Sequence, residues 1–169
     1  DGVFPFAVQN SYGGPKAFQQ LVDAAHAQDI AVILDVVYNH FGPEGNYAPN
    51  YGPYFTDKYG TPWGSAINFD DAYSHGVRDF VLANVRMWFA HYHVDALRID
   101  AAHALKDWSA SHILQDIRKE TNAWIEEQER DHYLIVECDL NDKRYLESLE
   151  KNGFAMDGQW VDEFHHALR

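Results

Sequence analysis

Short apolar runs mark the predicted strands of this chain. They lie at residues 30–37, 94–100 and 133–137, where Val, Ile and Leu follow one another with few polar interruptions. Such short, β-branched runs are typical of strands that are covered on both faces. A fourth extended segment is predicted at residues 156–162.

Segments of helical periodicity lie between these strands. Residues 14–28 and 77–92 repeat apolar side chains at three- and four-residue steps, which predicts helices with one buried face. Ser109 is predicted as the N-cap of a third helix. A shorter helix is predicted at residues 142–151, with Gly153 as its C′ residue.

Alternation of helices and strands indicates parallel strands joined by right-handed crossovers. About four such units fit this length, half of the eight that close a barrel. We therefore expect an α/β fold, a partial (β/α)8 TIM barrel. Residues 1–169 are expected to be the central part of a single catalytic barrel domain, and thus a fragment of a longer protein.

Residues 40–70 are predicted to be a long loop insertion, because glycine and proline recur throughout them. The loop is rich in aromatic residues, which could stack on sugar rings or simply pack the loop onto the barrel. These residues are Phe41, Tyr47, Tyr51, Tyr54, Phe55, Tyr59 and Trp63.

Composition narrows the classes of partner. A formal charge of −13 opposes binding to phosphate backbones, so we expect no nucleic-acid partner. No apolar stretch approaches the roughly 18 residues of a membrane span, so no membrane association is expected. The chain starts at Asp1 without a visible leader, and its lone Cys138 favours a reducing compartment. We therefore expect a cytoplasmic protein.

Two acids, Asp100 and Glu137, end successive predicted strands, where active sites of (β/α) folds are built. Strand alternation places Arg98 and Asp100 on one face, so the arginine would keep Asp100 ionised, as a nucleophile requires. Glu137 would then be the general acid/base. The alternative is a structural ion pair of Arg98 with Asp100, with Glu137 as a helix cap or surface acid.

Histidines raise the possibility of a metal site. His91 and His93 have the spacing of some metal ligands, and His165 and His166 are adjacent. However, His91 and His93 precede their strand, at the end of a barrel away from the chemistry. We expect no metal and no other cofactor, and we interpret Asn39 as a structural hydrogen-bonding residue.

Three ordered motifs resemble signature regions of the α-amylase superfamily, glycoside hydrolase family 13. They are Asp35-Val36-Val37-Tyr38-Asn39-His40, Leu97-Arg98-Ile99-Asp100-Ala101-Ala102-His103 and Ile135-Val136-Glu137. The resemblance implies a (β/α)8 barrel, of which the chain would hold roughly strands 3 to 6.

The same resemblance implies roles for five residues. Asp100 would be the nucleophile and Glu137 the general acid/base. Arg98 and His40 would contact the sugar at the cleaved position, and His103 the neighbouring sugar. The fourth signature region, which carries a third acid, is not found, and Asp162 and Glu163 should not be taken for it.

Within the superfamily the long loop and the segment after Glu137 are most similar to the malto-oligosyltrehalose trehalohydrolases. The similar segments include Phe41-Gly42-Pro43-Glu44-Gly45-Asn46-Tyr47, Thr61-Pro62-Trp63-Gly64 and Asp139-Leu140-Asn141-Asp142. This implies a retaining hydrolase, with an α-glucan or maltooligosyl trehalose as substrate, that releases trehalose. The alternatives are a 1,4-α-glucan branching enzyme and a catalytically inactive amylase-like binding module.

Overall fold

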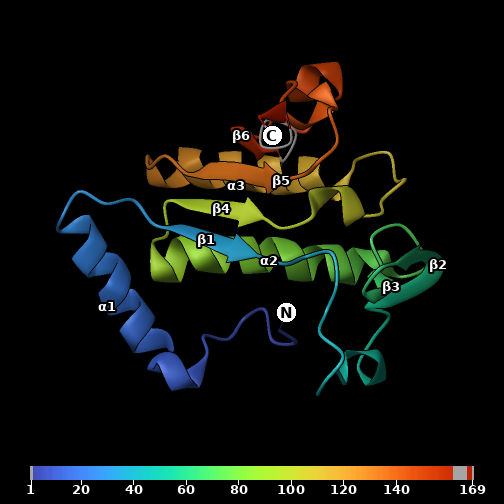
Figure 1. The fold of residues 1–169 in the computed structure, drawn as a ribbon, viewed down its shortest axis with the longest axis horizontal. Helices are drawn as coiled ribbons and strands as arrows, with labels where there is room; N and C mark the ends of the chain where they lie inside the picture. The colour runs from blue at the N-terminus through green and yellow to red at the C-terminus, as the bar shows by residue number, and fades with distance from the viewer. Residues whose placement is uncertain (1, 162–166, 169) are drawn as a thin grey trace.

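The computed structural model describes residues 2–161 and 167–168. Four parallel strands form its main sheet, in the order β1 (Ile33–Val36), β4 (Ala96–Ile99), β5 (Tyr133–Glu137) and β6 (Gly158–Trp160). All four point the same way, so their carboxyl ends meet at one edge of the sheet (Figure 1). The predicted parallel arrangement is confirmed.

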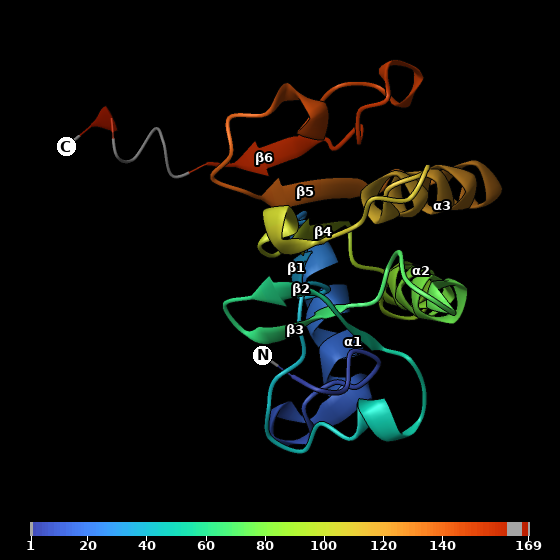
Figure 2. The same cartoon turned by 90° about the vertical axis from the view of Figure 1, so that its right-hand side faces the viewer.

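Three α-helices precede strands of the sheet: α1 (Gly14–His26) comes before β1, α2 (Ser74–Tyr92) before β4 and α3 (Ile113–Gln128) before β5. Helices α2 and α3 lie side by side on one face of the sheet (Figure 2). Leu97 and Ile99 of β4 are fully buried in the same apolar cluster as the inner faces of these helices. The alternation predicted for this strand is therefore confirmed.

The opposite face of the sheet is open. Ile33 and Tyr133 are 49% and 50% exposed there, and Asp35, two residues after Ile33 on the same face, is also exposed. In a (β/α)8 barrel this face points toward the axis, and the helices form the outer ring. The half-covered sheet therefore has the layering of a partial barrel, as predicted.

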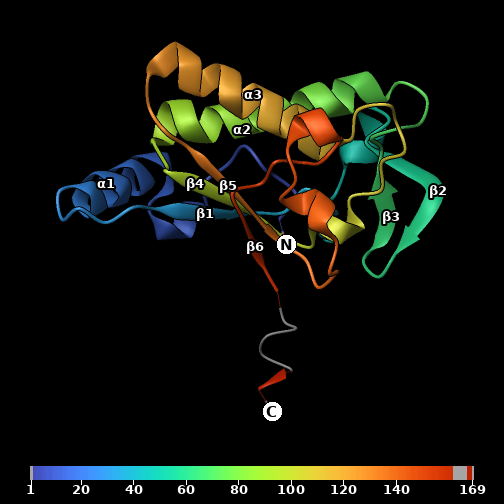
Figure 3. The same cartoon turned by 90° about the horizontal axis from the view of Figure 1, so that it is seen from above.

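The segment predicted as a long loop contains regular structure. An antiparallel hairpin forms from β2 (Phe55–Thr61) and β3 (Gly64–Ile67), and a 3-10 turn, η2 (Ala48–Asn50), precedes it. Figure 3 shows the hairpin at the end of the molecule toward which the sheet strands run. Irregular register between Thr56 and Gly60 hides its two-residue periodicity in the sequence.

The predicted N-cap of the third helix is wrong. His112 caps α3 instead, because its side chain accepts a hydrogen bond from Leu114 N–H while Gln115 reaches back to the backbone of His112. Ser109 lies outside the helix and hydrogen-bonds Asp107. Serine is a common N-cap residue and histidine is not, so the sequence favoured Ser109 over His112.

The short helix predicted at residues 142–151 is two separate 3-10 turns, η4 (Lys143–Tyr145) and η5 (Leu149–Lys151). The left-handed residue after η5 is Asn152, with φ 60°, rather than Gly153. Gly153 is needed for close approach, since a Cβ there would lie 2.1 Å from Glu147 O.

The remaining elements are short. They are η1 (Asn10–Tyr12), which precedes α1, and η3 (Ala102–Ala104), which follows β4. The last strand covers less than the predicted residues 156–162, and Asp162 lies outside the described residues. Among residues 2–161 and 167–168, no helix has both the length and the apolar character needed to cross a membrane.

Candidate active site

Asp100 and Glu137 meet at the carboxyl edge of the sheet. Asp100 directly follows β4, where its N–H donates to Val36 O at 2.9 Å, and Glu137 is the last residue of β5. The next N–H, that of Ala101, donates to Glu137 Oε2 at 2.8 Å. The predicted convergence of these two acids is therefore present in the structure.

Arg98 lies between the carboxylates. Its Nη1 is 3.0 Å from Asp100 Oδ1 and 2.8 Å from both carboxylate oxygens of Asp35, and its Nη2 is 3.8 Å from Glu137 Oε2. The guanidinium also lies 4.9 Å from the ring centroid of Trp160. Burial opposes the charge of Arg98, but hydrogen bonds to Asp35 and Asp100 and the charge of Glu137 raise its pKa. Arg98 therefore stays cationic next to all three acids.

These contacts bear on the alternative that Arg98 and Asp100 form only a structural ion pair. The ion pair of Arg98 with Asp100 is present, but it is part of a larger group that also includes Glu137 and Asp35. Three acids around one arginine at a strand edge are more than a single stabilising pair needs.

Asn39 and His40 follow β1 at the same edge. Asn39 Nδ2 donates to Asp100 O at 2.8 Å, which is the structural hydrogen bond expected for this residue. The Asn39 side-chain oxygen accepts from His40 Nδ1, so this chain of contacts fixes the imidazole next to Asp100. Burial lowers the pKa of His40, although the charge of Asp100 opposes the shift. A neutral imidazole results at neutral pH.

Trp63 covers His40 from the hairpin. The two rings are stacked, with centroids 4.8 Å apart and an interplanar angle of 11°. Trp63, one of the aromatic residues of the long loop, thus has its ring stacked on a predicted site residue. The structure brings the tip of the hairpin to the strand edge, which the sequence did not predict.

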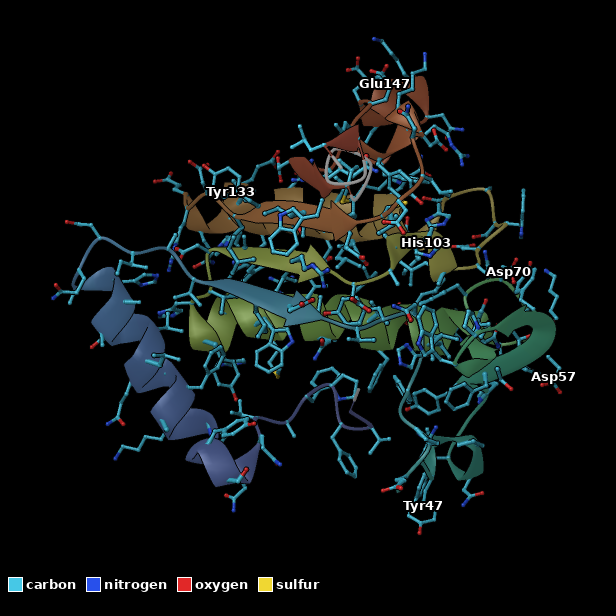
Figure 4. All side chains as sticks on the ribbon, viewed as in Figure 1. Tyr47, Asp57, Asp70, His103, Tyr133 and Glu147 are labelled. Atoms are coloured by element: carbon cyan, nitrogen blue, oxygen red, sulfur yellow. The ribbon has the colours of Figure 1, made fainter. Side chains whose placement is uncertain are left out.

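His103 lies in η3, immediately after the turn that follows Asp100. Ala101 adopts a left-handed conformation, with φ 40°, and this turns the chain from β4 into η3. His103 Nδ1 is buried, and the carbonyl of the same residue accepts from Lys106 Nζ at 3.2 Å. Figure 4 places His103 beyond the end of β4, at the same edge of the sheet as the carboxylates.

The structure describes two of the four histidines that raised the possibility of a metal site, His91 and His93. His91 lies in the last turn of α2, and His93 follows the helix with φ 55° before β4, so both lie at the amino edge of the sheet, as expected. Within the part of the chain that the structure describes, no three His, Cys, Asp or Glu side chains could hold a metal ion. His165, His166 and Glu163 lie outside the described residues.

The sequence predicts no role in this site for Asp35 and Trp160, and it indicates Trp63 only as one of several aromatic residues in the long loop. Asp35 faces Arg98 in the parallel register of β1 and β4, a pairing that the sequence alone does not fix. Trp160 pairs with Glu137 in the register of β5 and β6, a relation that depends on sheet order.

Residues 6–57 match the family model described as alpha amylase, catalytic domain. Malto-oligosyltrehalose trehalohydrolase of Saccharolobus solfataricus is 54% identical over 168 residues, which cover 99% of this chain and 29% of the relative. A 1,4-alpha-glucan branching enzyme of Synechococcus is 34% identical over 106 residues, or 57% of this chain and 13% of its own length.

A solved structure agrees with the sequence relatives. A crystal structure of a Salmonella typhimurium protein, provisionally named an α-amylase, superposes with a TM-score of 0.85 at 36% identity, covering 99% of this chain and 28% of that one. The chain thus spans about 29% of the length of the curated relatives it matches. Motifs, fold and relatives agree, and the chain belongs to the α-amylase family.

Proposed function

We propose that this chain supplies the nucleophile and the general acid/base of a retaining glycoside hydrolase. The enzyme would cleave the α-1,4 bond next to a terminal trehalose of maltooligosyl trehalose. The observation that carries the proposal is the placement of Asp100 and Glu137 on adjacent parallel strand ends, with Arg98 in contact with both. Two carboxyl groups on opposite sides of a glycosidic bond are the machinery of retaining hydrolysis.

In the first step, a carboxylate oxygen of Asp100 attacks the anomeric carbon of the glucose at the cleaved bond. The glycosidic bond breaks, and Glu137 gives its proton to the departing oxygen, which becomes a hydroxyl of trehalose. The maltodextrin is then held as an ester on Asp100. Arg98 suits this step, because it holds Asp100 with a charge-assisted hydrogen bond of 3.0 Å.

In the second step, Glu137 takes a proton from a water molecule. The resulting hydroxide-like oxygen attacks the same anomeric carbon, and the ester bond to Asp100 breaks. Asp100 leaves as a carboxylate, Glu137 is protonated again, and a maltodextrin with retained configuration is released. Inversion at each of the two steps gives net retention.

Three further residues are proposed to bind substrate. Arg98 and His40 contact the sugar at the cleaved position, and His103 contacts the neighbouring sugar. The fixed, neutral His40 supports this role, because the Nδ1–H donates to Asn39 and leaves Nε2 able to accept a hydrogen bond from a sugar hydroxyl. No cofactor is needed for this chemistry.

The domain organisation is part of the proposal. Residues 1–169 would be the central part of one catalytic (β/α)8 barrel, with residues 40–70 as an insertion over its carboxyl edge. A third acid would come from a part of that barrel outside residues 1–169. We also place the enzyme in the cytoplasm, for which the unpaired, buried Cys138 is the supporting observation.

A branching enzyme is the nearest alternative, because it would form the same ester and pass the glucan to a sugar hydroxyl. The greater identity and coverage of the trehalohydrolase relative, 54% against 34%, favour hydrolysis. The two activities differ in products. Hydrolysis yields trehalose from trehalose-capped maltodextrin, whereas branching yields new α-1,6 linkages without free trehalose.

The test uses the full-length protein that contains this chain. Asp100→Asn is expected to lower trehalose release by about 10³-fold or more, since the ester can no longer form. Glu137→Ala should lose hydrolysis of the natural substrate but still be glycosylated by a maltosyl fluoride, whose leaving group needs no proton. Mass spectrometry of the trapped ester on Asp100 checks both steps.

Asp57→Asn, an exposed acid on the hairpin, is the matched control and should keep wild-type turnover. Unchanged trehalose release by Asp100→Asn would overturn the nucleophile assignment. Branched glucan in place of trehalose from the wild-type protein would instead favour the transferase, and no turnover of either kind would favour the inactive module.

A further inference from the structure

Two segments flank the proposed site at the carboxyl edge of the sheet. The first is the β2–β3 hairpin, whose Trp63 covers His40. The second is the His103 segment, residues 102–112, which joins η3 to α3. The two lie beside each other at the end of the sheet (Figures 1 and 3). Their relative position therefore sets the distance between Trp63, which covers the proposed sugar contact His40, and the second proposed contact, His103.

Asp70 joins these two segments directly. Its Oδ2 accepts a hydrogen bond from Tyr59 Oη at 2.5 Å and from Lys58 Nζ at 3.1 Å, both on β2. The same oxygen accepts from the backbone N–H of Trp108 at 2.9 Å, in the His103 segment. Figure 4 shows Asp70 at the hairpin end of the molecule, on the side that faces His103.

The Asp70 carboxylate is both buried and ionised. Its side chain is only 2% exposed. Burial alone would raise the pKa of Asp70, but the hydrogen bonds from Tyr59, Trp108 N–H and Lys58 together lower it. Hydrogen bonds to an ionised acceptor are stronger than hydrogen bonds between neutral groups. The charge of Asp70 therefore strengthens the link between the hairpin and the His103 segment.

A second residue fixes the same region from the helix side. Arg78 of α2 donates to Phe69 O at 2.9 Å, to Asp107 Oδ2 at 2.7 Å and to Ser111 O at 2.6 Å. Arg78 therefore anchors the base of the hairpin and the His103 segment to the core. Asp70 acts further out, where it contacts the body of the hairpin instead of its base.

Neither link involves the carboxylate pair. Asp100 and Glu137 make their hydrogen bonds and ion pairs with Arg98, Asn39, Val36 and Ala101. Loss of the Asp70 link would consequently leave the reacting groups in place while allowing the hairpin and the His103 segment to separate.

We propose that Asp70 is a positioning residue for the substrate. It couples the hairpin to the His103 segment, so that His40 under Trp63 and His103 present one fixed surface to adjoining sugars. This inference rests on the proposed function for the identity of the substrate, but the coupling itself does not depend on it. Pre-organised contacts of this kind strengthen binding, because less freedom is lost when the ligand arrives.

The test combines exchange and kinetics on the full-length protein. Asp70→Ala removes the acceptor, Asp70→Asn keeps one oxygen without the charge, and Tyr59→Phe removes a single hairpin bond. Asp57→Asn serves as the control, because Asp57 is an exposed acid of β2, the strand that carries Tyr59. Hydrogen–deuterium exchange is expected to rise in residues 55–67 and 105–112 together in Asp70→Ala, less in Asp70→Asn, and not in the control.

The kinetic expectation is a change in KM. Because the reacting carboxylates keep their partners, Asp70→Ala should raise the KM for trehalose-capped maltodextrin about tenfold, with kcat within about threefold of wild type. Asp70→Asn and Tyr59→Phe should give smaller increases in the same direction.

Each outcome separates the coupling from the proposed function. Faster exchange in only one of the two segments, or an unchanged KM with a lowered kcat, would overturn the positioning role. If the wild-type protein released no trehalose while exchange rose in both segments, the proposed function would fail and the coupling by Asp70 would stand. If Asp70→Ala does not fold, the Tyr59→Phe and Asp70→Asn exchange data decide the question.

Discussion

The backbone N–H of Ala101 donates a 2.8 Å hydrogen bond to Glu137 Oε2, so the residue after one proposed catalytic acid holds the other. Ala101 does so in a left-handed conformation, with φ 40° and ψ 50°. A non-glycine residue there is under strain of about 1–3 kcal/mol, which the surrounding contacts must offset. The turn thus ties the geometry of the two carboxylates to a single backbone position.

Substitutions at Ala101 should therefore separate the effect of backbone strain from the effect of displacing the N–H that holds Glu137. Ala101→Gly keeps the N–H and adopts a positive φ without strain, so kcat should remain within about twofold of wild type. Ala101→Val places a β-branched side chain at the same φ, which should displace the N–H and lower kcat about tenfold or more. Steady-state kinetics with trehalose-capped maltodextrin checks both, and equal activity of the two variants would contradict this account.

Arg98 should not be replaceable by lysine. A single ammonium cannot reach Asp35, Asp100 and Glu137 together, as the two guanidinium nitrogens do. Arg98→Lys is thus expected to lower kcat about 10²-fold while the protein remains folded.

The matched variant for Arg98 is Asp35→Asn. It removes the charge of an exposed partner and leaves the contacts of Arg98 with Asp100 and Glu137 intact. Its effect on kcat should be several-fold smaller than that of Arg98→Lys. Similar losses in both variants would show that Asp35 itself contributes to the chemistry.

His112 makes stability depend on pH. Burial lowers the pKa of His112, an effect that the charges of Arg78 and Arg144 reinforce and that Asp107 and the carbonyl of Leu105 oppose. Its ring also packs on Phe154, 4.6 Å between centroids. Because the imidazole caps α3 by accepting from Leu114 N–H, it must be neutral at Nδ1 to do so.

Because folding lowers the pKa of His112, the protein loses stability as the pH falls. The cap contributes its stability above the ordinary histidine pKa of about 6.5, and this contribution is lost as pH falls through the folded value. His112→Asn supplies a cap that does not titrate, so melting temperature should fall less between pH 7.5 and pH 5 than in wild type. His75→Asn, at an exposed site, should leave the pH dependence unchanged.

Gly153 should be the glycine least tolerant of a side chain in the region after β5. An added Cβ would lie 2.1 Å from Glu147 O, a contact that requires the backbone to shift. Gly153→Ala is expected to destabilise the protein by about 2–4 kcal/mol.

Gly158→Ala is the comparison for Gly153, because its Cβ would meet Ile135 at an ordinary 3.8 Å. This variant should change the free energy of unfolding by less than about 1 kcal/mol. Urea unfolding of both variants gives the difference, and equal stabilities would show that the Glu147 backbone relaxes freely.

Much of the fold could be predicted from periodicity, because a buried strand or helix face requires apolar residues at regular spacing in the sequence. The stripe of α2 and the alternation of Leu97, Arg98, Ile99 and Asp100 are examples. Prediction failed where local signals were weak or misleading. The hairpin is interrupted by a register shift, and α3 is capped by His112 instead of the more usual Ser109.

For the candidate site, the sequence by itself determined that Asp100 and Glu137 end successive strands and that Arg98 shares the face of Asp100. The tertiary structure alone decided which distant groups complete the arrangement. Asp35 meets Arg98 across 63 positions, and Asp70 meets Trp108 across 38. Such pairings depend on sheet order and loop path, which arise from packing of the whole chain and leave no periodic trace in the sequence.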